Sequence, residues 1–362
     1  MAIDQDTLQK LRTETAEPAQ PLDLSWLNIE DEGHPWGMRA KPGKRGLTLD
    51  EVEIGAAGIV PEHSDNRSVR VRGSVPRKDA PRLPGAYANK SDVYSDNARL
   101  LYEEAVTRQW SSATDIPWET IEPLSDDMER AMCQLCTFLT EVEFIAGDTP
   151  AQWLNTINSE HHEVKLFLLS QIMDEGRHLD VFRKRAFANG GGLLSSLPQD
   201  GLRVIIEAKD FTEMSAIMHV AAEGFVQSMF RMGEYIGQNH AEKTIFRLCG
   251  QDESRHLGFG VLHLKYVLDN EPWRREELHH YLDKVETTLA PDPMDTDSQN
   301  FALFEALAIL MGGGIKNFDK GLQASMGVQR KRVNEYMHRL NVAGLGDRRE
   351  RMTPLLRQFL DN

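Results

Sequence analysis

The chain has 362 residues, of which 40 % are hydrophobic and 27 % charged, a composition typical of a globular protein with ample core. Its formal net charge of −15 argues against a nucleic-acid partner, because no basic excess exists to neutralise phosphates. No stretch approaches the roughly 20 apolar residues of a membrane span. No signal peptide is visible, and three cysteines suit a reducing compartment. We therefore expect a soluble, cytoplasmic protein without a membrane partner.

The predicted elements change in character along the chain. Residues 1–90 are rich in proline and charge and lack a helical period, which predicts an extended, mostly irregular N-terminal arm with at most a short strand at residues 68–71. From residue 91 the hydrophobic pattern becomes helical. The predicted helices span residues 92–109, 125–157, 160–188, 200–237, 240–269, 272–289, 297–318, 320–341 and 348–360. The fold class is therefore all-α, with a helical bundle at residues 91–290 and C-terminal helices at residues 291–362 packed on it.

Two short motifs, "DEGRH" and "DESRH", lie 78 positions apart. On a helix, residues three apart share a face, so Glu175 with His178, and Glu253 with His256, each offer a carboxylate and an imidazole to one point. Apolar residues share these faces, and buried charged groups are costly unless they are paired or bind a metal. Carboxylate and imidazole suit iron or manganese, and zinc less well. The motifs therefore predict the two halves of a metal site rather than two surface salt-bridge clusters.

Four-helix di-metal proteins also use one lone glutamate from each of the two remaining helices. In an antiparallel pair that glutamate lies level with its partner when the turn falls midway between them. Glu223 precedes Glu253 by 30 residues, with the midpoint in "GQNH", and Glu143 precedes Glu175 by 32, with the midpoint in "NTINSE". Glu141 passes the same test and stays an alternative to Glu143.

The remaining charged residues of the motifs suggest support for the metal ligands. Asp174 and Asp252 lie about 100° round the helix from the glutamates, so each could accept a hydrogen bond from the ligand histidine of the other half. Arg177 and Arg255 could pair with these aspartates across the bundle. Plain surface salt bridges are the alternative.

With these pieces in place, the sequence resembles the ferritin-like superfamily of carboxylate-bridged di-iron oxidases and oxygenases over roughly residues 92–270. The resemblance implies a ferritin-like four-helix bundle core, two iron ions and O₂ as co-substrate. It implies that one ion is bound by Glu143, Glu175 and His178, and the other by Glu223, Glu253 and His256. It also implies that Glu175 and Glu253 bridge the ions at the catalytic centre.

At three places the sequence differs from the motifs of known branches of the superfamily, and these differences indicate which branches it resembles less. Phe182 stands where the radical subunit of ribonucleotide reductase has a tyrosine, so no tyrosyl radical is expected there. Val226 and Gln227 stand near the usual threonine of the monooxygenases and desaturases, and Gln227 could orient a water or a substrate. Cys249 replaces the third histidine of the aminobenzoate N-oxygenases, although His219 faces the same cavity. It could be an extra ligand, a hydrogen-bond donor or a buried, satisfied histidine.

Taken together, the residues and the resemblance predict a di-iron, O₂-dependent oxidoreductase that hydroxylates, N-oxygenates or desaturates a small organic substrate. The alternatives are a non-catalytic metal-binding or scaffold protein and a Mn or mixed Mn/Fe oxidase. No flavin or iron–sulfur motif is visible, so a separate electron donor or reductase is implied, and we expect a homodimer. The candidate walls of the substrate pocket are Phe144, Phe182, Phe225 and Phe230, with positions in the ordinary core as an equal alternative. The histidine pairs at 161–162 and 279–280 are expected on the surface.

Overall fold

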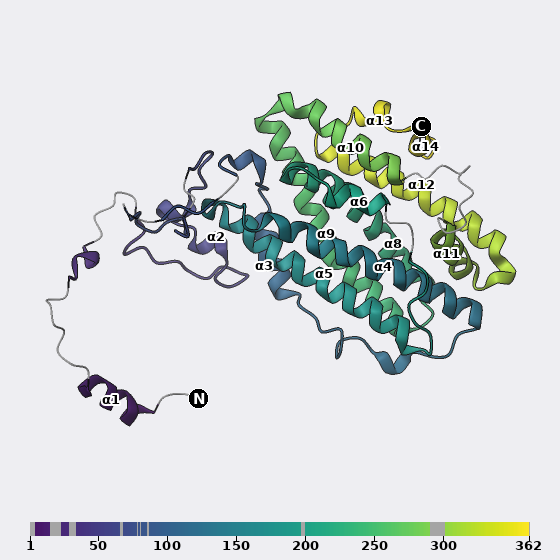
Figure 1. Cartoon of the computed structure of the whole chain (residues 1–362), viewed down its shortest axis with the longest axis horizontal. Coiled ribbons are helices and arrows are strands. Elements are labelled where there is room, and N and C mark those ends of the chain that lie inside the picture. Colours follow the sequence, from purple (N-terminus) through teal and green to yellow (C-terminus); the bar gives the residue numbers. More distant parts are fainter. Residues whose placement is uncertain are drawn as a thin grey trace.

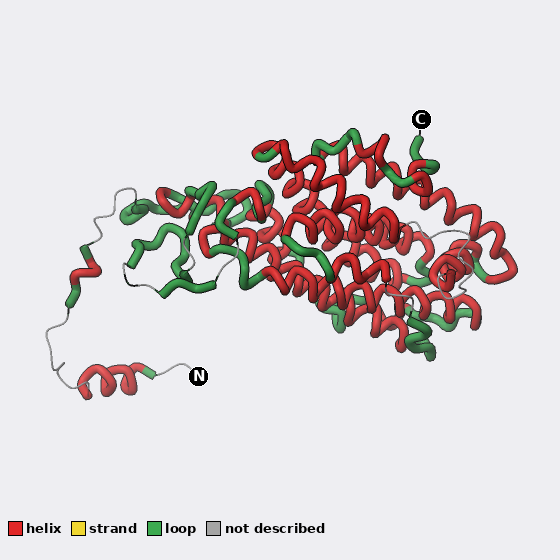
Figure 2. Tube along the Cα trace, turned by 45° about the horizontal axis from the view of Figure 1, so that its top comes forward, coloured by secondary structure: helices red, strands yellow, loops and turns green. Residues whose placement is uncertain are grey.

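The computed structural model describes residues 4–14, 23–28, 34–65, 68–77, 79, 81–84, 87–196, 200–289 and 301–361. Over this part the chain forms helices and loops and no strand, which confirms the all-α class (Figure 2). Two isolated bridges, Gly43 with Gly46 and His63 with Asn89, are the only β-type pairs there. No helix in the same ranges is both long enough and apolar enough to cross a membrane.

Four long helices make the bundle (Figure 1). They are α4 (Asp126–Trp153), α5 (His162–Ala188), α8 (Glu223–Ile236) and α9 (His240–Asn270). Helix α4 packs along α5, α8 packs along α9, and α5 also contacts α9. Both turns predicted at the glutamate midpoints hold an asparagine cap. The side chain of Asn158 accepts from Glu160 N at 3.0 Å, and that of Asn239 accepts from Glu242 N at 2.9 Å.

The single helix predicted over residues 200–237 is wrong in detail. Helix α6 (Asp200–Ile206) ends early, and a new helix starts at α7 (Phe211–Met214), where the Asp210 side chain caps Glu213 N at 2.8 Å. The chain then passes through a π-helical segment, Ser215–Ala222, into α8. Asp210 explains the break, because a capping aspartate favours a helix start over a helix interior.

Further helices surround the bundle. Helix α3 (Ala98–Thr107) packs on α5 and α9, and α10 (Arg275–Leu289) packs on the π-helical segment. Helix α11 (Ala302–Gly312) lies against α4 and α12 (Phe318–Val342), and α12 also contacts α8 and α9. The predicted helix over residues 348–360 is divided at Thr353 into α13 (Arg348–Arg351) and α14 (Pro354–Arg357), because Pro354 starts a new helix.

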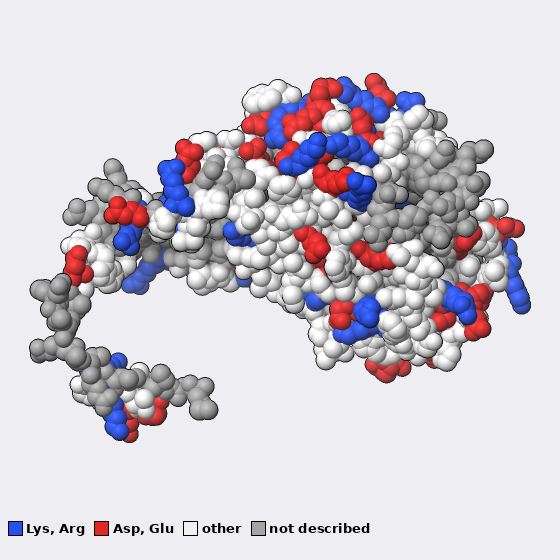
Figure 3. Space-filling view, in the orientation of Figure 1, with Lys and Arg blue, Asp and Glu red and all other residues white. Residues whose placement is uncertain are grey.

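Ion pairs tie the C-terminal end of the chain to α10. Arg348 Nη2 lies 2.7 Å from Asp283 Oδ1, and Arg351 Nη1 lies 2.7 Å from Glu276 Oε2. Figure 3 shows the resulting mixture of acidic and basic side chains over these helices, at the top of the view. The structure thus places opposite charges side by side there.

The residues before α3 carry short helices, α1 (Gln5–Glu14) and α2 (Leu49–Val52), and long loops. The strand considered for residues 68–71 is not formed. Instead Arg72 reaches the start of α5, where its Nη1 and Nη2 donate to Glu163 at 2.8 and 3.0 Å. Arg70 binds Glu160 beside it. Side-chain anchoring therefore replaces backbone pairing in this segment, and the boundaries predicted near residues 90 and 290 stay a prediction.

The surface position expected for two histidine pairs is wrong for one member of each. His161 is buried, with Nε2 3.4 Å from Pro61 O. His279 is buried and its Nε2 lies 3.0 Å from Asp347 Oδ2. Segments distant in sequence cover both residues, so their own helices gave no sign of it.

Two apolar clusters fill the bundle, and polar side chains lie between them. One cluster includes Phe167 and Phe259, and the other includes Phe182 and Phe230. The ring centroid of His256 lies 6.4 Å from that of Phe167, and the centroid of His178 lies 6.2 Å from that of Phe230. The charged motifs are thus enclosed on both sides by core.

Candidate metal centre

Six side chains from the four bundle helices converge in this enclosed layer. They are Glu143 on α4, Glu175 and His178 on α5, Glu223 on α8, and Glu253 and His256 on α9. None is more than 4 % exposed. The antiparallel hairpins bring the lone glutamates level with the Glu-x-x-His turns, as the midpoints predict.

The six residues form two overlapping groups. In each group the ligand atoms all lie within 4.8 Å of one another. The first group is Glu143, Glu175, His178 and Glu253, and the second is Glu175, Glu223, Glu253 and His256. Glu175 and Glu253 belong to both, which is the arrangement that two bridging carboxylates require.

Each histidine turns Nδ1 inward, toward glutamates of both motifs. His178 Nδ1 lies 3.1 Å from Glu175 Oε2 and 3.2 Å from Glu253 Oε1. His256 Nδ1 lies 3.0 Å from Glu175 Oε1 and 3.6 Å from Glu253 Oε2. Glu143 Oε2 completes the first group at 3.6 Å from His178 Nδ1. The two halves are therefore related by an approximate two-fold arrangement.

The residues present fit two cations. Three of these buried carboxylate oxygens have no hydrogen-bond partner among the described residues: Glu143 Oε1, Glu223 Oε2 and Glu253 Oε2. Orphaned polar atoms of this kind are costly in a protein interior. Burial, reinforced by the charge of Glu253, raises the pKa of both Glu143 and Glu223 well above the usual range. Two divalent cations would satisfy the orphaned atoms and keep all four carboxylates ionised.

Aspartates hold the outer nitrogen of each histidine. His178 Nε2 lies 3.2 Å from Asp252 Oδ2, and His256 Nε2 lies 3.3 Å from Asp174 Oδ2, so each contact crosses to the other motif. An aspartate at Nε2 keeps the proton there and leaves the Nδ1 lone pair for a metal. Each aspartate therefore selects the binding tautomer of the opposite histidine.

Arginines balance the charge of these aspartates. Arg255 Nη2 lies 2.8 Å from Asp174 Oδ2, and Arg177 Nη2 lies 3.2 Å from Asp252 Oδ2. Each arginine also pairs with the aspartate of its own motif. The four residues form a closed, buried ring of charge around the outer edge of the centre, and not a set of surface salt bridges.

Trp110 also belongs to this layer, and the sequence reasoning missed it. Its Nε1 donates to Asp252 Oδ2 at 2.8 Å, and its ring stacks on His178 with centroids 6.3 Å apart. The Arg177 guanidinium lies 5.2 Å from the indole centroid. Trp110 follows α3 in a loop with no periodic pattern, so only its neighbourhood in the folded chain reveals the contact.

Glu141 and His219, the alternative and the possible extra metal ligand, both lie outside the two groups. Glu141 is half-buried and lies outside both groups, whereas Glu143 is inside the first. His219 is not grouped either. Its Nε2 lies 3.1 Å from Gln171 Oε1, and Gln171 Nε2 donates to Glu223 Oε1 at 2.9 Å. His219 therefore reaches the centre through Gln171, and burial lowers its pKa to about 3, which keeps the ring neutral.

Gln227 forms its hydrogen bonds with residues outside the six clustered ones. Its Nε2 donates to Ser254 Oγ at 2.7 Å, and its Oε1 accepts from Arg339 Nη2 at 3.1 Å. The structure thus places Gln227 in contact with α9 and α12, and the suggested contact with a water or a substrate stays a prediction.

A small cavity of about 20 Å³ lies beside Glu143, Glu223 and Glu253. Its remaining lining is apolar: Val142, Ala146, Ile205, Met218, Ala222 and Val226. This volume has room for about one water molecule. The cavity lies against the glutamates rather than the histidines, so a small reactant would approach from the α4 and α8 side.

None of the four phenylalanines expected as pocket walls lines this cavity. Phe144 is 59 % exposed, which makes that expectation wrong. Phe182 and Phe230 stack on each other with centroids 5.4 Å apart, and Phe225 packs on Tyr336. Phe182, Phe225 and Phe230 therefore take the alternative that the sequence left open, which is a position in the core.

The π-helical segment before Glu223 sits directly on α9. A Cβ built on Gly260 would lie 2.4 Å from His219 Cβ, so only glycine permits this approach. π-Helical turns are rare and occur frequently at functional sites. The widened turn positions both Met218 in the cavity wall and the start of α8 at Glu223.

No family model and no curated protein matches the sequence, but solved structures resemble the fold. One is a point mutant of an R2-like ligand-binding oxidase with an aerobically reconstituted Mn/Fe cofactor. It is 17 % identical, with a TM-score of 0.51 over 67 % of this chain and 92 % of that one. Another R2-like ligand-binding oxidase with the same cofactor is 15 % identical, with a TM-score of 0.50 over 74 % and 94 %. The chain has the ferritin-like fold.

Nearly the whole of each ferritin-like neighbour has a counterpart here, whereas a quarter to a third of this chain has none. At this identity the likeness concerns the fold alone. The choice of candidate metal ligands rests on the geometry of this chain.

Proposed function

We propose that the protein is a di-metal, O₂-dependent oxidoreductase that acts on a small organic molecule. The observation that carries the proposal is the pair of buried groups that share Glu175 and Glu253. A storage or scaffold role does not need a small, mostly apolar cavity against three of the glutamates, and this chain has one. The similar solved structures are described as oxidases with Mn/Fe cofactors, which supports the same chemistry.

In this proposal each residue has a defined task. Glu143 and His178 would hold one ion, Glu223 and His256 would hold the other, and Glu175 and Glu253 would be available to both. When bound, the two ions supply the reductive activation of O₂. Asp174 and Asp252 fix the histidine rings through Nε2. Gln171 donates to Glu223 and restrains that carboxylate.

The cavity determines which part of a substrate reacts. Its wall is apolar apart from the three glutamates, and its small volume would hold a single C–H or N–H group of a substrate there. Hydroxylation, N-oxygenation and desaturation all fit this placement. Phe182 lies in the core against Phe230, so no phenol is available at that position for a stored radical.

A mixed Mn/Fe centre is the second candidate, because the two halves differ in their surroundings. Trp110 donates to Asp252 and stacks on His178, and Gln171 donates to Glu223 on the other side. Unequal hydrogen bonding around two sites tunes them differently. A separate reductase and a homodimer remain part of the proposal.

The test loads the full chain with Fe, Mn or both, reduces it without air, and then admits O₂. We expect O₂ uptake and a transient absorption band in wild type. Glu175→Ala should abolish both the O₂ uptake and the absorption band. His280 is an exposed histidine on α10, so the control variant His280→Ala should behave as wild type. A protein that binds two ions yet consumes no O₂ would be a metal-binding protein and not an oxidase.

A further inference from the structure

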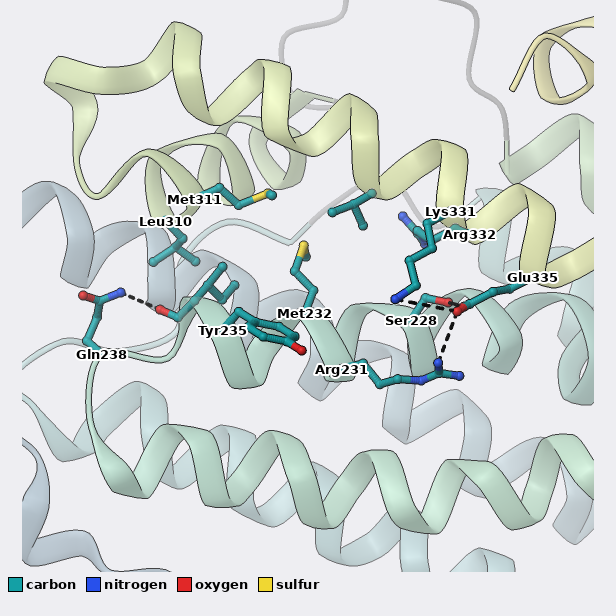
Figure 4. A pocket seen from close by; sticks show the side chains of 12 residues that line it. Ser228, Arg231, Met232, Tyr235, Gln238, Leu310, Met311, Lys331, Arg332 and Glu335 are labelled. Atoms are coloured by element: carbon teal, nitrogen blue, oxygen red, sulfur yellow. Dashed lines mark hydrogen bonds and ion pairs between the residues drawn. The ribbon is translucent and has the colours of Figure 1, made fainter. Parts of the chain in front are cut away.

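A second, larger pocket lies outside the metal centre, between α8 and the C-terminal helices α11 and α12 (Figure 4). Its volume is about 350 Å³, within the range of small-molecule sites. Helix α8, which carries Glu223, contributes Ser228, Arg231 and Met232 to the wall. Nothing in the proposed di-metal chemistry uses this pocket.

One end of the pocket carries an excess of positive charge. Arg231, Lys331 and Arg332 line it, together with a single carboxylate, Glu335. Glu335 Oε1 lies 3.2 Å from Arg231 Nη1 and 4.0 Å from Lys331 Nζ, and Ser228 Oγ donates to its other oxygen at 2.8 Å. One carboxylate cannot neutralise three cations. This cationic end stands out in a chain whose net charge is −15.

Arg332 is the least compensated of these cations. Its side chain is half-buried, and its Nε is inaccessible and has no hydrogen-bond partner in the described part of the chain. Its other contacts are Nη1 to Gln329 Oε1 at 3.3 Å and the guanidinium 4.8 Å from the Phe225 ring centroid. Within the described ranges no carboxylate forms an ion pair with it. A guanidinium without a paired carboxylate can donate to an anion through its terminal nitrogens.

The other end of the pocket is mostly apolar; its one amide, Gln238, donates to the Ile236 carbonyl. Its other side chains are Met232, Tyr235, Ile236, Leu310, Met311 and Val328. In Figure 4, Leu310 and Met311 lie at one side of the pocket, Lys331, Arg332 and Glu335 at the other, and Met232 between them. The pocket therefore has a cationic end and an apolar end, separated along its length.

We propose that this pocket binds a small amphiphilic organic anion. A carboxylate or phosphate head would bind to Arg332 and Lys331, and an apolar body would lie against Met232, Leu310 and Met311. The shared chemistry is an anionic head on an aliphatic body. The inference does not depend on the proposed oxidase function, because no residue of the metal centre takes part.

The test titrates the full metal-loaded chain with octanoate and with octyl phosphate by calorimetry, with octanol and octyltrimethylammonium as neutral and cationic comparisons. We expect saturable binding of the anions at one site per chain and at least about tenfold weaker binding of the other two. Equal binding of octanol would overturn the proposal. Preference for octyl phosphate or for octanoate would identify the head group.

Variants separate this pocket from the metal centre, which could itself bind a carboxylate. Lys331→Glu and Arg332→Gln should each weaken binding about tenfold or more. Lys331 is 70 % exposed, so its variant should fold even if the Arg332 variant does not. Lys320→Glu, an exposed change on the same helix outside the pocket, should have no effect. Loss of binding in His178→Ala but not in Lys331→Glu would place the anion at the metal centre and sink the proposal.

Discussion

His178 on α5 bonds through Nε2 to Asp252 on α9, 3.2 Å away, and not to the aspartate of its own motif. The mirror contact joins His256 to Asp174 at 3.3 Å. The repeated D-E-x-R-H motif is thus one interlocked unit, in which each half orients the ligand histidine of the other. Burial of this ring of charges is reasonable only because every member is paired.

Asp252→Asn should therefore weaken metal binding without unfolding the chain. The amide cannot hold the Nε2 proton of His178 as a carboxylate does, and changes of this kind cost about 10- to 100-fold in metal affinity. Competition with a chelator measures the effect. Asp269→Asn is the matched control, since Asp269 is an exposed residue of the same helix. Equal metal affinity in all three proteins would mean that Asp252 does not orient the ligand.

Glu143→Ala and Glu141→Ala form a pair that decides the first ligand. Glu143 is buried within the first group, whereas Glu141 is half-buried outside it. We expect the Glu143 variant to lose metal at one site and the Glu141 variant to bind as wild type. Metal analysis after gel filtration measures the number of bound ions in each variant. Metal loss in the Glu141 variant alone would make Glu141, and not Glu143, the first ligand.

Trp110→Phe tests the contact that the sequence did not predict. Phenylalanine keeps the stacking on His178 but removes the Nε1 donor to Asp252. We expect a metal affinity lowered by a smaller factor than in Asp252→Asn, roughly tenfold or less, because one hydrogen bond to a charged group is lost. A loss as large as that of Asp252→Asn would indicate a larger role for the indole.

Gly260→Ala tests the close approach of α9 to the π-helical segment. The new Cβ would lie 2.4 Å from His219 Cβ, so the variant should lose roughly 1–3 kcal/mol of unfolding free energy. Gly258→Ala is the matched control on the same helix. Its Cβ would meet nothing closer than 3.7 Å, and helix propensity should stabilise it by up to about 1 kcal/mol. Urea unfolding of both variants checks the sign, and a stabilised Gly260 variant would refute the close contact.

Much of this arrangement could be predicted from the sequence, because its signals are local. The Glu-x-x-His turns need only helix periodicity, and the lone glutamates need only a midpoint turn, each of which ends in an asparagine cap. The crossed contacts of Asp174 and Asp252 also follow from the angle round a helix. These features depend on residues within one helical hairpin or on the approximate two-fold relation between the two hairpins.

The rest depends on segments that meet only in the folded chain. Trp110 reaches Asp252 from a loop, and His279 is covered by Asp347 from the C-terminal end. The helix break at Asp210 was missed because apolar residues continue on both sides of it. Phe144 is a candidate pocket wall on a ligand helix, yet it directly follows Glu143, and neighbouring helical residues point about 100° apart.

The most direct test of the account is the metal content of the full chain after anaerobic loading with Fe and Mn, compared with Glu175→Ala and Glu253→Ala. The shared position of these two glutamates predicts about two ions per wild-type chain and the loss of most of both ions in each variant. Two ions retained in either variant, or fewer than about one in wild type, would contradict a carboxylate-bridged di-metal centre.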